Sequence, residues 1–314
     1  DGGCTCGFWG RSRLVFGFAK SREVCSSPRL PAPTRTAPNM RKLIDEEHVL
    51  AVIGNVGTPT AVAAIPITNA SKTPFIGAFT GAGFLRKMPP DRYVINYRAS
   101  YAEETSAMVD ALVTHGGLKP HEIAFFTQRD AYGDAGFVGG IAALKRHGLD
   151  DENAVLHSRY ERNTLAVENG LADIIMSGQR PRAVIMVGAY NPCAAFIHLA
   201  RQSGLDAMFL NVSFVGAEAL AEKLGDQGDG VIVTQVVPHF DSALPIVGEY
   251  RKALNGWNPS TQPTFGSLEG YIATRILCRA LKTIQGPLTK EGIVNALEEL
   301  GEFDMGLGQR LRLG

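Results

Sequence analysis

The sequence lacks the features that mark several large classes of protein. Its 314 residues contain 31 Lys+Arg and 31 Asp+Glu, so it has no basic excess of the kind that nucleic-acid-binding proteins usually carry. No apolar run approaches the roughly 18 residues expected of a membrane-spanning helix. The five cysteines are scattered and form no CxxC pair, which argues against a zinc site.

Motifs for common enzymatic chemistry are also missing. The stretch GAGFLR (81–86) lacks the third glycine of a dinucleotide-binding fingerprint, and no GxxxxGK[ST] phosphate loop occurs. GSLEG (266–270) has the wrong spacing for a nucleophile elbow. The seven histidines show neither HxxxH nor HExxH spacing. We therefore expect no enzyme, no metal site and no cofactor, and we expect Cys193 and Cys278 to be small core residues.

A regular alternation of short apolar strands and helical segments is present from about residue 36. The expected strands are VLAVIG (49–54), TPFIGAF (73–79), RYVINYRA (92–99), EIAFFTQ (122–128), AVLHSRY (154–160), RAVIMVGA (182–189), AMFLNVSF (207–214) and GVIVTQVVP (230–238). Helices are expected over 39–48, 60–70, 101–116, 135–148, 165–179, 192–204, 216–225, 242–254, 267–284 and 290–300. This pattern predicts an α/β fold whose parallel sheets are covered on both faces.

Ligands of such sheets bind beyond the carboxyl ends of the strands, so the residues after each strand are the first candidates. Within VIGNVGTPTAVAAIPI (52–67), Thr58 precedes Pro59 and is expected to be the N-cap of a helix. The unpaired N–H groups of that helix start would suit a carboxylate, although a single such turn is more simply explained as a plain strand-to-helix turn. Small or hydroxyl residues follow most of the other strands as well, in AFTGAG (78–83), RDAYGDAG (129–136), Tyr190-Asn191-Pro192 and Ser213-Phe214.

The chain from about Arg35 to about Gly306 resembles the type I periplasmic solute-binding proteins of ABC transporters, in particular the leucine/isoleucine/valine-binding-protein-like group. The motifs that carry the resemblance are RKLIDEEHVLAVIGNVGTPT, PFIGAFTGAGFLR, YVINYRASYAEE, DAYGDAG, VIMVGAYNP, FLNVSFVGAEAL, GVIVTQVVP and SLEGYIATRIL. The resemblance implies two doubly wound lobes with parallel sheets, joined by three hinge crossovers. Lobe one would comprise 35–98 and 229–300, and lobe two 99–228 and 301–314.

The family's ligand positions carry over onto this sequence one at a time. Thr58 matches a hydroxyl residue that binds the ligand carboxylate, and Phe79, Thr80 and Gly81 match a second lobe-one loop. Tyr132 and Tyr190 match two aromatics of lobe two. Ser213 stands where amino-acid binders of the family often have an acidic residue for the ligand's ammonium group, which argues for a ligand without an amine. The remaining candidates are Phe214 beside Ser213 and Gln235 after the strand VIVT.

The function implied by the resemblance is capture of a small ligand between the lobes and its delivery to an ABC permease in the membrane. The ligand would be a branched-chain or aromatic carboxylate or amino acid, and the location periplasmic. An alternative is a ligand-sensing regulatory domain of the same fold that acts on a partner protein. Ordinary packing roles also remain open for Phe79, Tyr132 and Tyr190.

Residues 1–34 depart from the family, which places a strand, a ligand loop, a helix and a second strand there. This segment is rich in Gly, Ser, Pro and Arg, shows no sustained period and has no signal peptide. We expect it to be foreign to the fold and poorly packed, with RLVFGF (13–18) as its only candidate strand. The sequence begins with Asp and ends on GEFDMGLGQRLRLG, so we also expect a fragment or processed chain that is truncated at its C-terminus.

Overall fold

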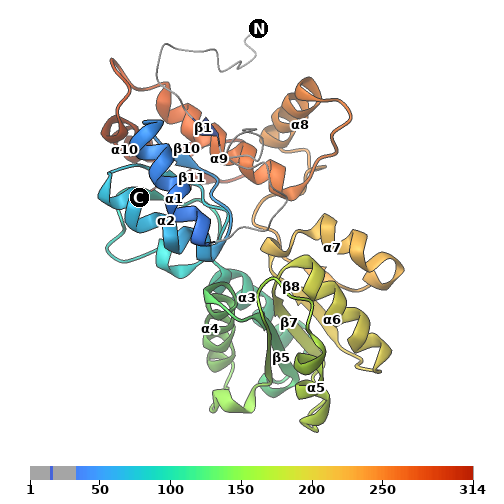
Figure 1. Cartoon of the computed structure of the whole chain (residues 1–314). Helices are drawn as coiled ribbons and strands as arrows, with labels where there is room; N and C mark the ends of the chain where they lie inside the picture. Colours follow the sequence, from blue (N-terminus) through green and yellow to red (C-terminus); the bar gives the residue numbers. More distant parts are fainter. Residues whose placement is uncertain (1–14, 17–32, 314) are drawn as a thin grey trace.

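The computed structural model describes residues 15–16 and 33–313, which fold into two α/β lobes (Figure 1). The helices are α1 (Pro33–Arg41), α2 (Thr58–Ala70), α3 (Tyr101–Asp110), α4 (Ala131–Arg146), α5 (Glu168–Met176), α6 (Tyr190–Gln202), α7 (Ala217–Leu224), α8 (Pro245–Trp257), α9 (Phe265–Leu281) and α10 (Lys290–Glu299). A wider helical turn continues α1 to Glu46 and α3 to His115. The expected α/β class with parallel sheets is confirmed.

Lobe one is built on a parallel sheet with the order β1-β2-β3-β4. Its strands are β1 (Val15–Phe16), β2 (Val52–Ile53), β3 (Phe75–Ile76) and β4 (Val94–Ile95). On one face, Phe75 and Val94 pack with α1 and α2. On the other face, Ile53 and Ile76 pack with apolar residues of α8, α9 and α10. Both faces are therefore covered, as the continuously apolar strands predict.

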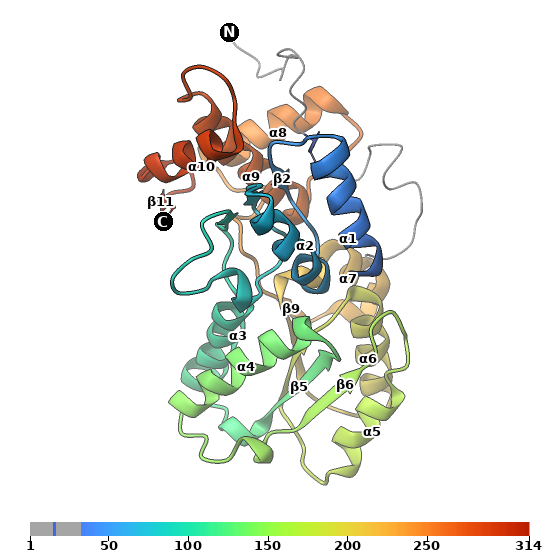
Figure 2. The ribbon, with the colours of Figure 1, turned by 60° about the vertical axis from the view of Figure 1, so that its left-hand side comes forward.

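Lobe two is built on a parallel sheet with the order β6-β5-β7-β8-β9. Its strands are β5 (Ile123–Gln128), β6 (His157–Tyr160), β7 (Ala183–Val187), β8 (Met208–Asn211) and β9 (Ile232–Val233). Helices α3 and α4 lie on one side of this sheet, and α5 and α6 lie on the other (Figure 2). Alternate residues of β5 supply the two cores, since Phe125 faces α3 and α4 whereas Phe126 faces α5 and α6. Cys193 is fully buried in the second core, as expected.

Two of the expected lobe boundaries are wrong. Strand β9 pairs in parallel with β8, so the chain stays in lobe two until Val233 and does not return to lobe one at residue 229. The hairpin of β10 (Glu302–Asp304) and β11 (Arg310–Arg312) belongs to lobe one, because Phe303 is buried in the core shared by α8, α9 and α10. The described residues therefore cross between the lobes twice, after β4 and after β9, and not three times.

Most of the segment 1–34 lies outside the described residues. The prediction that this segment packs poorly therefore falls mostly on residues that the structure does not describe. Within the stretch expected to supply a strand, Val15 and Phe16 form β1 and pair in parallel with Val52 and Ile53. Helix α1 begins at Pro33, six residues before the expected start at residue 39. Proline is favoured at the first position of a helix, where its missing N–H leaves no bond unmade.

Candidate functional site

Two loops of lobe one are held together beyond the carboxyl ends of β2 and β3. The Thr58 and Thr80 hydroxyls lie 2.7 Å apart and both side chains are buried. The backbones are joined as well, since Phe79 N–H donates to the Asn55 carbonyl (2.8 Å) and Gly57 N–H donates to the Phe79 carbonyl (3.2 Å). This arrangement brings together the two lobe-one segments that the sequence singled out.

The expectation that Thr58 is the N-cap of α2 is wrong. Gly57 occupies the cap with φ of 99°, a conformation that a side chain would strain, and Thr58 is the first helical residue. The Thr58 hydroxyl therefore does not cap the helix and instead forms a hydrogen bond with the Thr80 hydroxyl. The first N–H groups of α2 still have no partner within the helix, so its positive end lies beside the two hydroxyls.

Tyr101 approaches these loops from the start of α3. Ser100 caps that helix, accepting from Glu103 N–H while the Glu103 carboxylate accepts from Ser100 N–H. Tyr101 N–H then donates to the Gly81 carbonyl at 2.8 Å, and a Cβ on Gly81 would lie only 2.6 Å from that nitrogen. Glycine at position 81 thus permits the close approach. The buried Tyr101 hydroxyl lies toward Thr80 but makes no hydrogen bond of ordinary geometry among the described residues.

Four aromatic rings form a connected cluster that includes Phe79, the residue before Thr80. Phe79 of lobe one lies 5.5 Å from Phe214 of lobe two, and Phe214 lies 4.8 Å from Tyr132 and 6.3 Å from Tyr101. Tyr132 is positioned by Asp130, which caps α4 and accepts from the Tyr132 N–H. The rings offer an apolar surface beside the polar loops, which is the mixture that small-molecule sites use.

A buried charge cluster, made of Arg98, Glu104 and Glu269, connects the two lobes. Arg98 lies on the crossover after β4, Glu104 on α3 in lobe two and Glu269 on α9 in lobe one. The Arg98 Nη1 lies 3.1 and 3.3 Å from the two Glu269 oxygens, and its Nη2 lies 3.6 Å from Glu104 Oε1. Ser213 completes the cluster, because it accepts from Arg98 Nη2 while its N–H donates to Glu104 Oε2 at 2.7 Å.

The charges of this cluster do not balance when both carboxyl groups are ionised, since two anions face one cation. Burial raises the pKa of Glu269 to about 7; the neighbouring Glu104 acts in the same direction, and Arg98 opposes them. Burial alone lowers the pKa of Arg98, but the carboxylates outweigh it and the net pKa shift is upward. Burial also raises the pKa of Tyr101 to about 12, so its phenol remains a hydrogen-bond donor at neutral pH.

The structure brings together most of the candidate residues from the sequence. Thr58, Phe79, Thr80, Gly81, Tyr132, Ser213 and Phe214 form one connected set through the contacts above. Tyr190 begins α6 and packs against the lobe-two core on the other side of the sheet. Gln235 is half-buried on the crossover after β9. Neither is joined to the set by a hydrogen bond or ring contact among the described residues, so their role stays a prediction.

Sequence reasoning missed Arg98, Tyr101, Glu104 and Glu269. A signal was present for the two acids, because each stands in a helical stripe of buried residues. Tyr101, Thr105 and Met108 surround Glu104 on α3, and Leu268, Ile272 and Ile276 surround Glu269 on α9. Charged residues are rarely buried without a partner, so an acid within an apolar stripe predicts a buried counter-ion.

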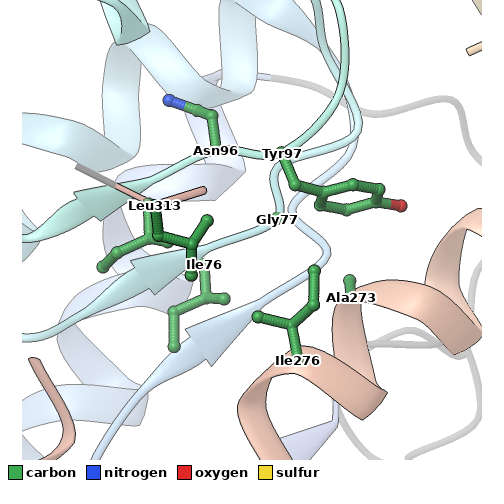
Figure 3. Close-up of a pocket in the computed structure, with 8 residues that line it drawn as sticks. Ile76, Gly77, Asn96, Tyr97, Ala273, Ile276 and Leu313 are labelled. Carbon is green, nitrogen blue, oxygen red and sulfur yellow. The ribbon is translucent and has the colours of Figure 1, made fainter. Parts of the chain in front are cut away.

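A small hollow elsewhere in lobe one is lined by apolar groups. It lies between the ends of β3 and β4 and helix α9, with Ile76, Tyr97, Ile276 and Leu313 around it (Figure 3). Helix α9 packs closely against Gly77 here, since an added Cβ on Gly77 would lie only 2.9 Å from the Cβ of Ala273. This hollow is part of the lobe-one packing and offers no set of polar groups for a ligand. In addition, the described residues contain no group of three or more His, Cys, Asp or Glu placed to ligate a metal.

The sequence matches the model of a known protein family over residues 32–313, and that family is described as periplasmic binding protein. The chain belongs to the periplasmic binding protein family. Within this family it is a type I protein of the leucine/isoleucine/valine-binding-protein-like group. No curated protein matches it.

Solved structures of other periplasmic binding proteins are similar to this one. A possible leucine/isoleucine/valine-binding protein from Rhodopirellula baltica SH 1 is 57% identical, with a TM-score of 0.87 over 90% of this chain and 76% of that chain. A substrate-binding periplasmic protein from Ralstonia solanacearum is 27% identical, with a TM-score of 0.79 over 88% and 77%. A solute-binding protein from R. palustris in complex with benzoate is 19% identical, with a TM-score of 0.74 over 90% and 75%, and shares the fold.

This periplasmic binding protein therefore comes from a family that binds solutes, and it shares its fold with a substrate-binding protein of an ABC transporter. Within residues 15–16 and 33–313, no helix combines the length and the apolar character needed to cross a bilayer.

Proposed function

We propose that this periplasmic binding protein is an extracytoplasmic receptor that captures a small carboxylate or amino-acid-like ligand between its lobes and delivers it to an ABC permease. The observation that carries the proposal is the buried pair of hydroxyls on Thr58 and Thr80 at the positive end of α2, 2.7 Å apart. Hydroxyls and helix N-termini are both favourable partners for a carboxylate.

The rings beside this pair would hold the apolar body of the ligand. Phe79 belongs to lobe one, whereas Tyr132 and Phe214 belong to lobe two, so a ligand between them would contact both lobes. Two similar structures support this chemistry, since one is a complex with benzoate, an aromatic carboxylate, and another is a possible leucine/isoleucine/valine-binding protein, whose named ligands are branched-chain amino acids. Gly81 would contribute backbone groups, and Tyr190, Ser213 and Gln235 would approach from lobe two and the crossover.

Ligand capture would then proceed by a hinge motion, without forming or breaking covalent bonds. The ligand carboxylate docks on the α2 end of lobe one, and the aromatic residues of lobe two close over the rest. The two crossovers after β4 and β9 are the segments about which such a motion would turn. Contacts made only in the closed form bias the equilibrium toward closure, and a permease would recognise that form.

Thr58→Val tests the proposal in the full chain. A thermal-shift screen against amino acids, aromatic acids and short aliphatic acids first identifies a ligand, and calorimetry then compares the variants. Loss of a hydrogen bond to a charged group costs about 1.5–3 kcal/mol, so T58V should bind about ten- to a hundredfold more weakly.

Thr68→Val is the matched control, because Thr68 is equally buried in the same helix but its hydroxyl donates, within the described part of the chain, only to the Ala64 and Ile65 carbonyls. T68V should leave the affinity unchanged. Equal affinities for T58V and the unmodified chain would remove the hydroxyl pair from the site. A chain that binds none of the acids would refute the proposed function.

A further inference from the structure

Tyr101 carries a buried phenol whose hydroxyl has no hydrogen-bond partner among the described residues. The residue is 0% exposed, so water at the protein surface does not reach the hydroxyl. A buried donor without an acceptor costs free energy, and buried side-chain polar groups are nearly always paired. Tyr101 is the first residue of α3, directly beyond the crossover that follows β4, so this unpaired group lies at the junction of the two lobes.

The Tyr101 ring is held in place on several sides. Its backbone N–H donates to the Gly81 carbonyl at 2.8 Å, and a Cβ on Gly81 would lie 2.9 Å from the Tyr101 Cδ1 atom. The ring also packs against Tyr132, with the centroids 5.0 Å apart, and meets Phe214 edge to face at 6.3 Å. The phenol therefore stays next to the Thr80 side chain, toward which its hydroxyl lies.

The hydroxyl protons of this region can be counted. Thr58 and Thr80 lie 2.7 Å apart, so one of these two hydroxyls donates to the other and the pair keeps a single proton for a third group. The Thr80 oxygen also accepts from the Ala82 N–H at 3.4 Å. The pKa of Tyr101 is raised to about 12 by burial, so its phenol is protonated at neutral pH and its proton has no acceptor within the described residues. The three hydroxyls thus offer two unused protons, whereas a carboxylate has two acceptor oxygens.

We propose that Tyr101 is a further ligand-binding residue, whose phenol donates to one oxygen of the ligand carboxylate while the Thr58 and Thr80 pair donates to the other. This inference rests on the proposed function, since it presupposes that a carboxylate docks at the α2 end of lobe one. The phenol then has an acceptor only when the site is filled. Binding removes the cost of the unpaired donor and adds a hydrogen bond to a charged group, which is stronger than one between neutral groups.

The same proton count predicts how the site treats a primary amide of the same shape as the acid. An amide has one acceptor oxygen, and its NH2 group only donates. One of the two protons offered by the three hydroxyls would then face another donor, and a buried donor left without an acceptor is costly. The site should therefore prefer an acid to its amide, and Tyr101 should account for part of that preference.

The test compares leucine with leucinamide and benzoate with benzamide, by calorimetry on the full chain, with a weakly bound amide measured by competition with its acid. Tyr101→Phe removes the phenol oxygen alone. Y101F should bind the acids about ten- to a hundredfold more weakly, as expected for loss of a hydrogen bond to a charged group. The ratio of acid to amide affinity should fall by about tenfold or more. This ratio decides, because a general weakening of binding cancels in it.

A second readout is the melting temperature of the protein without ligand. Y101F should melt no lower than the unmodified chain, because the oxygen it lacks has no partner within the described part of the protein. Tyr93→Phe is the matched control for affinity. Its phenol donates to Glu291 Oε2 at 2.9 Å, and it precedes β4, at the end of the strand opposite to the crossover. Y93F should leave the affinities and their ratio unchanged.

The outcomes separate this inference from the proposed function. If T58V weakens binding of the acids but Y101F leaves the acid-to-amide ratio unchanged, the role of Tyr101 is overturned and the proposed function stands. A free Y101F protein that melts lower by about 2–4 °C, the loss expected for one hydrogen bond, would show that the phenol has a partner in the protein and would also overturn it. A chain that binds no carboxylate overturns the proposed function and this inference together.

Discussion

Replacing Glu269 by glutamine should make the folded protein more stable in mildly alkaline solution, although it removes one member of a buried ion pair. The pKa of Glu269 rises from 4.5 to about 7 on folding, chiefly through burial. A carboxyl group with a raised pKa in the folded state contributes stability that is fully present below pH 4.5 and is lost as the pH rises through about 7. A glutamine side chain at this position is uncharged at every pH.

The size of the effect follows from the same values. One pKa unit corresponds to 1.36 kcal/mol, so a rise from 4.5 to about 7 amounts to about 3 kcal/mol. E269Q should therefore match the unmodified chain at pH 4.5 and exceed its free energy of unfolding by up to about 3 kcal/mol at about pH 8. Arg98 keeps Glu104 as its remaining anion in the variant, so no charge is left without a partner.

Urea unfolding followed by circular dichroism at the two pH values measures this difference. Glu291→Gln is the control with the opposite sign, because the Tyr93 hydroxyl and Arg92 lower the pKa of that exposed carboxyl group. E291Q should lose stability relative to the unmodified chain as the pH rises. The reasoning is refuted if E269Q is the less stable protein at about pH 8, or if the E269Q difference does not change with pH.

Two further predictions concern His157 and Gly140 in lobe two, with Gly248 in lobe one as the comparison for Gly140. Burial lowers the pKa of His157 to about 4, so its neutral form contributes stability that is present above pH 6.5 and is lost as the pH falls; the advantage of the unmodified chain over H157Q in melting temperature should shrink between about pH 7.5 and pH 5. A Cβ on Gly140 would lie 2.4 Å from the Phe125 ring, so G140A should lose about 1–3 kcal/mol of stability. A Cβ on Gly248 would meet nothing within 4 Å beyond the backbone of its own helix, so G248A should gain about 0.5–1 kcal/mol. Thermal unfolding distinguishes them, and a G140A protein as stable as G248A would contradict the packing described.

The fold could be predicted from the sequence because its strands carry a local signal. Residues 123–126 and Ala183–Val187 are continuous apolar runs followed by helical segments, and burial on both faces of a parallel sheet demands that pattern. The lobe boundaries could not be predicted in the same way. Val233 and Phe303 are apolar in either lobe, and only the pairing of β9 with β8 and the core around α9 decide where each belongs.

Part of the candidate site could be predicted from the sequence, and part could not. Thr58 and Thr80 follow strands of one parallel sheet, so their proximity follows from the strand ends lying at one edge. Arg98 and Glu269 are separated by 171 positions, and no local period links a crossover residue to a residue of a distant helix. The N-cap assignment of Thr58 failed for a different reason, since a glycine at positive φ took the cap one residue earlier.

The core that Ile53 and Ile76 share with α8, α9 and α10 affects how the chain folds as it is synthesised. Lobe two emerges from the ribosome as one continuous stretch, and its sheet is complete once Val233 is made. The lobe-one strands appear first, but the helices that cover one of their faces appear last. Until then that face is bare apolar surface beside a finished neighbour, which is the kind of nascent state that aggregates or recruits a chaperone.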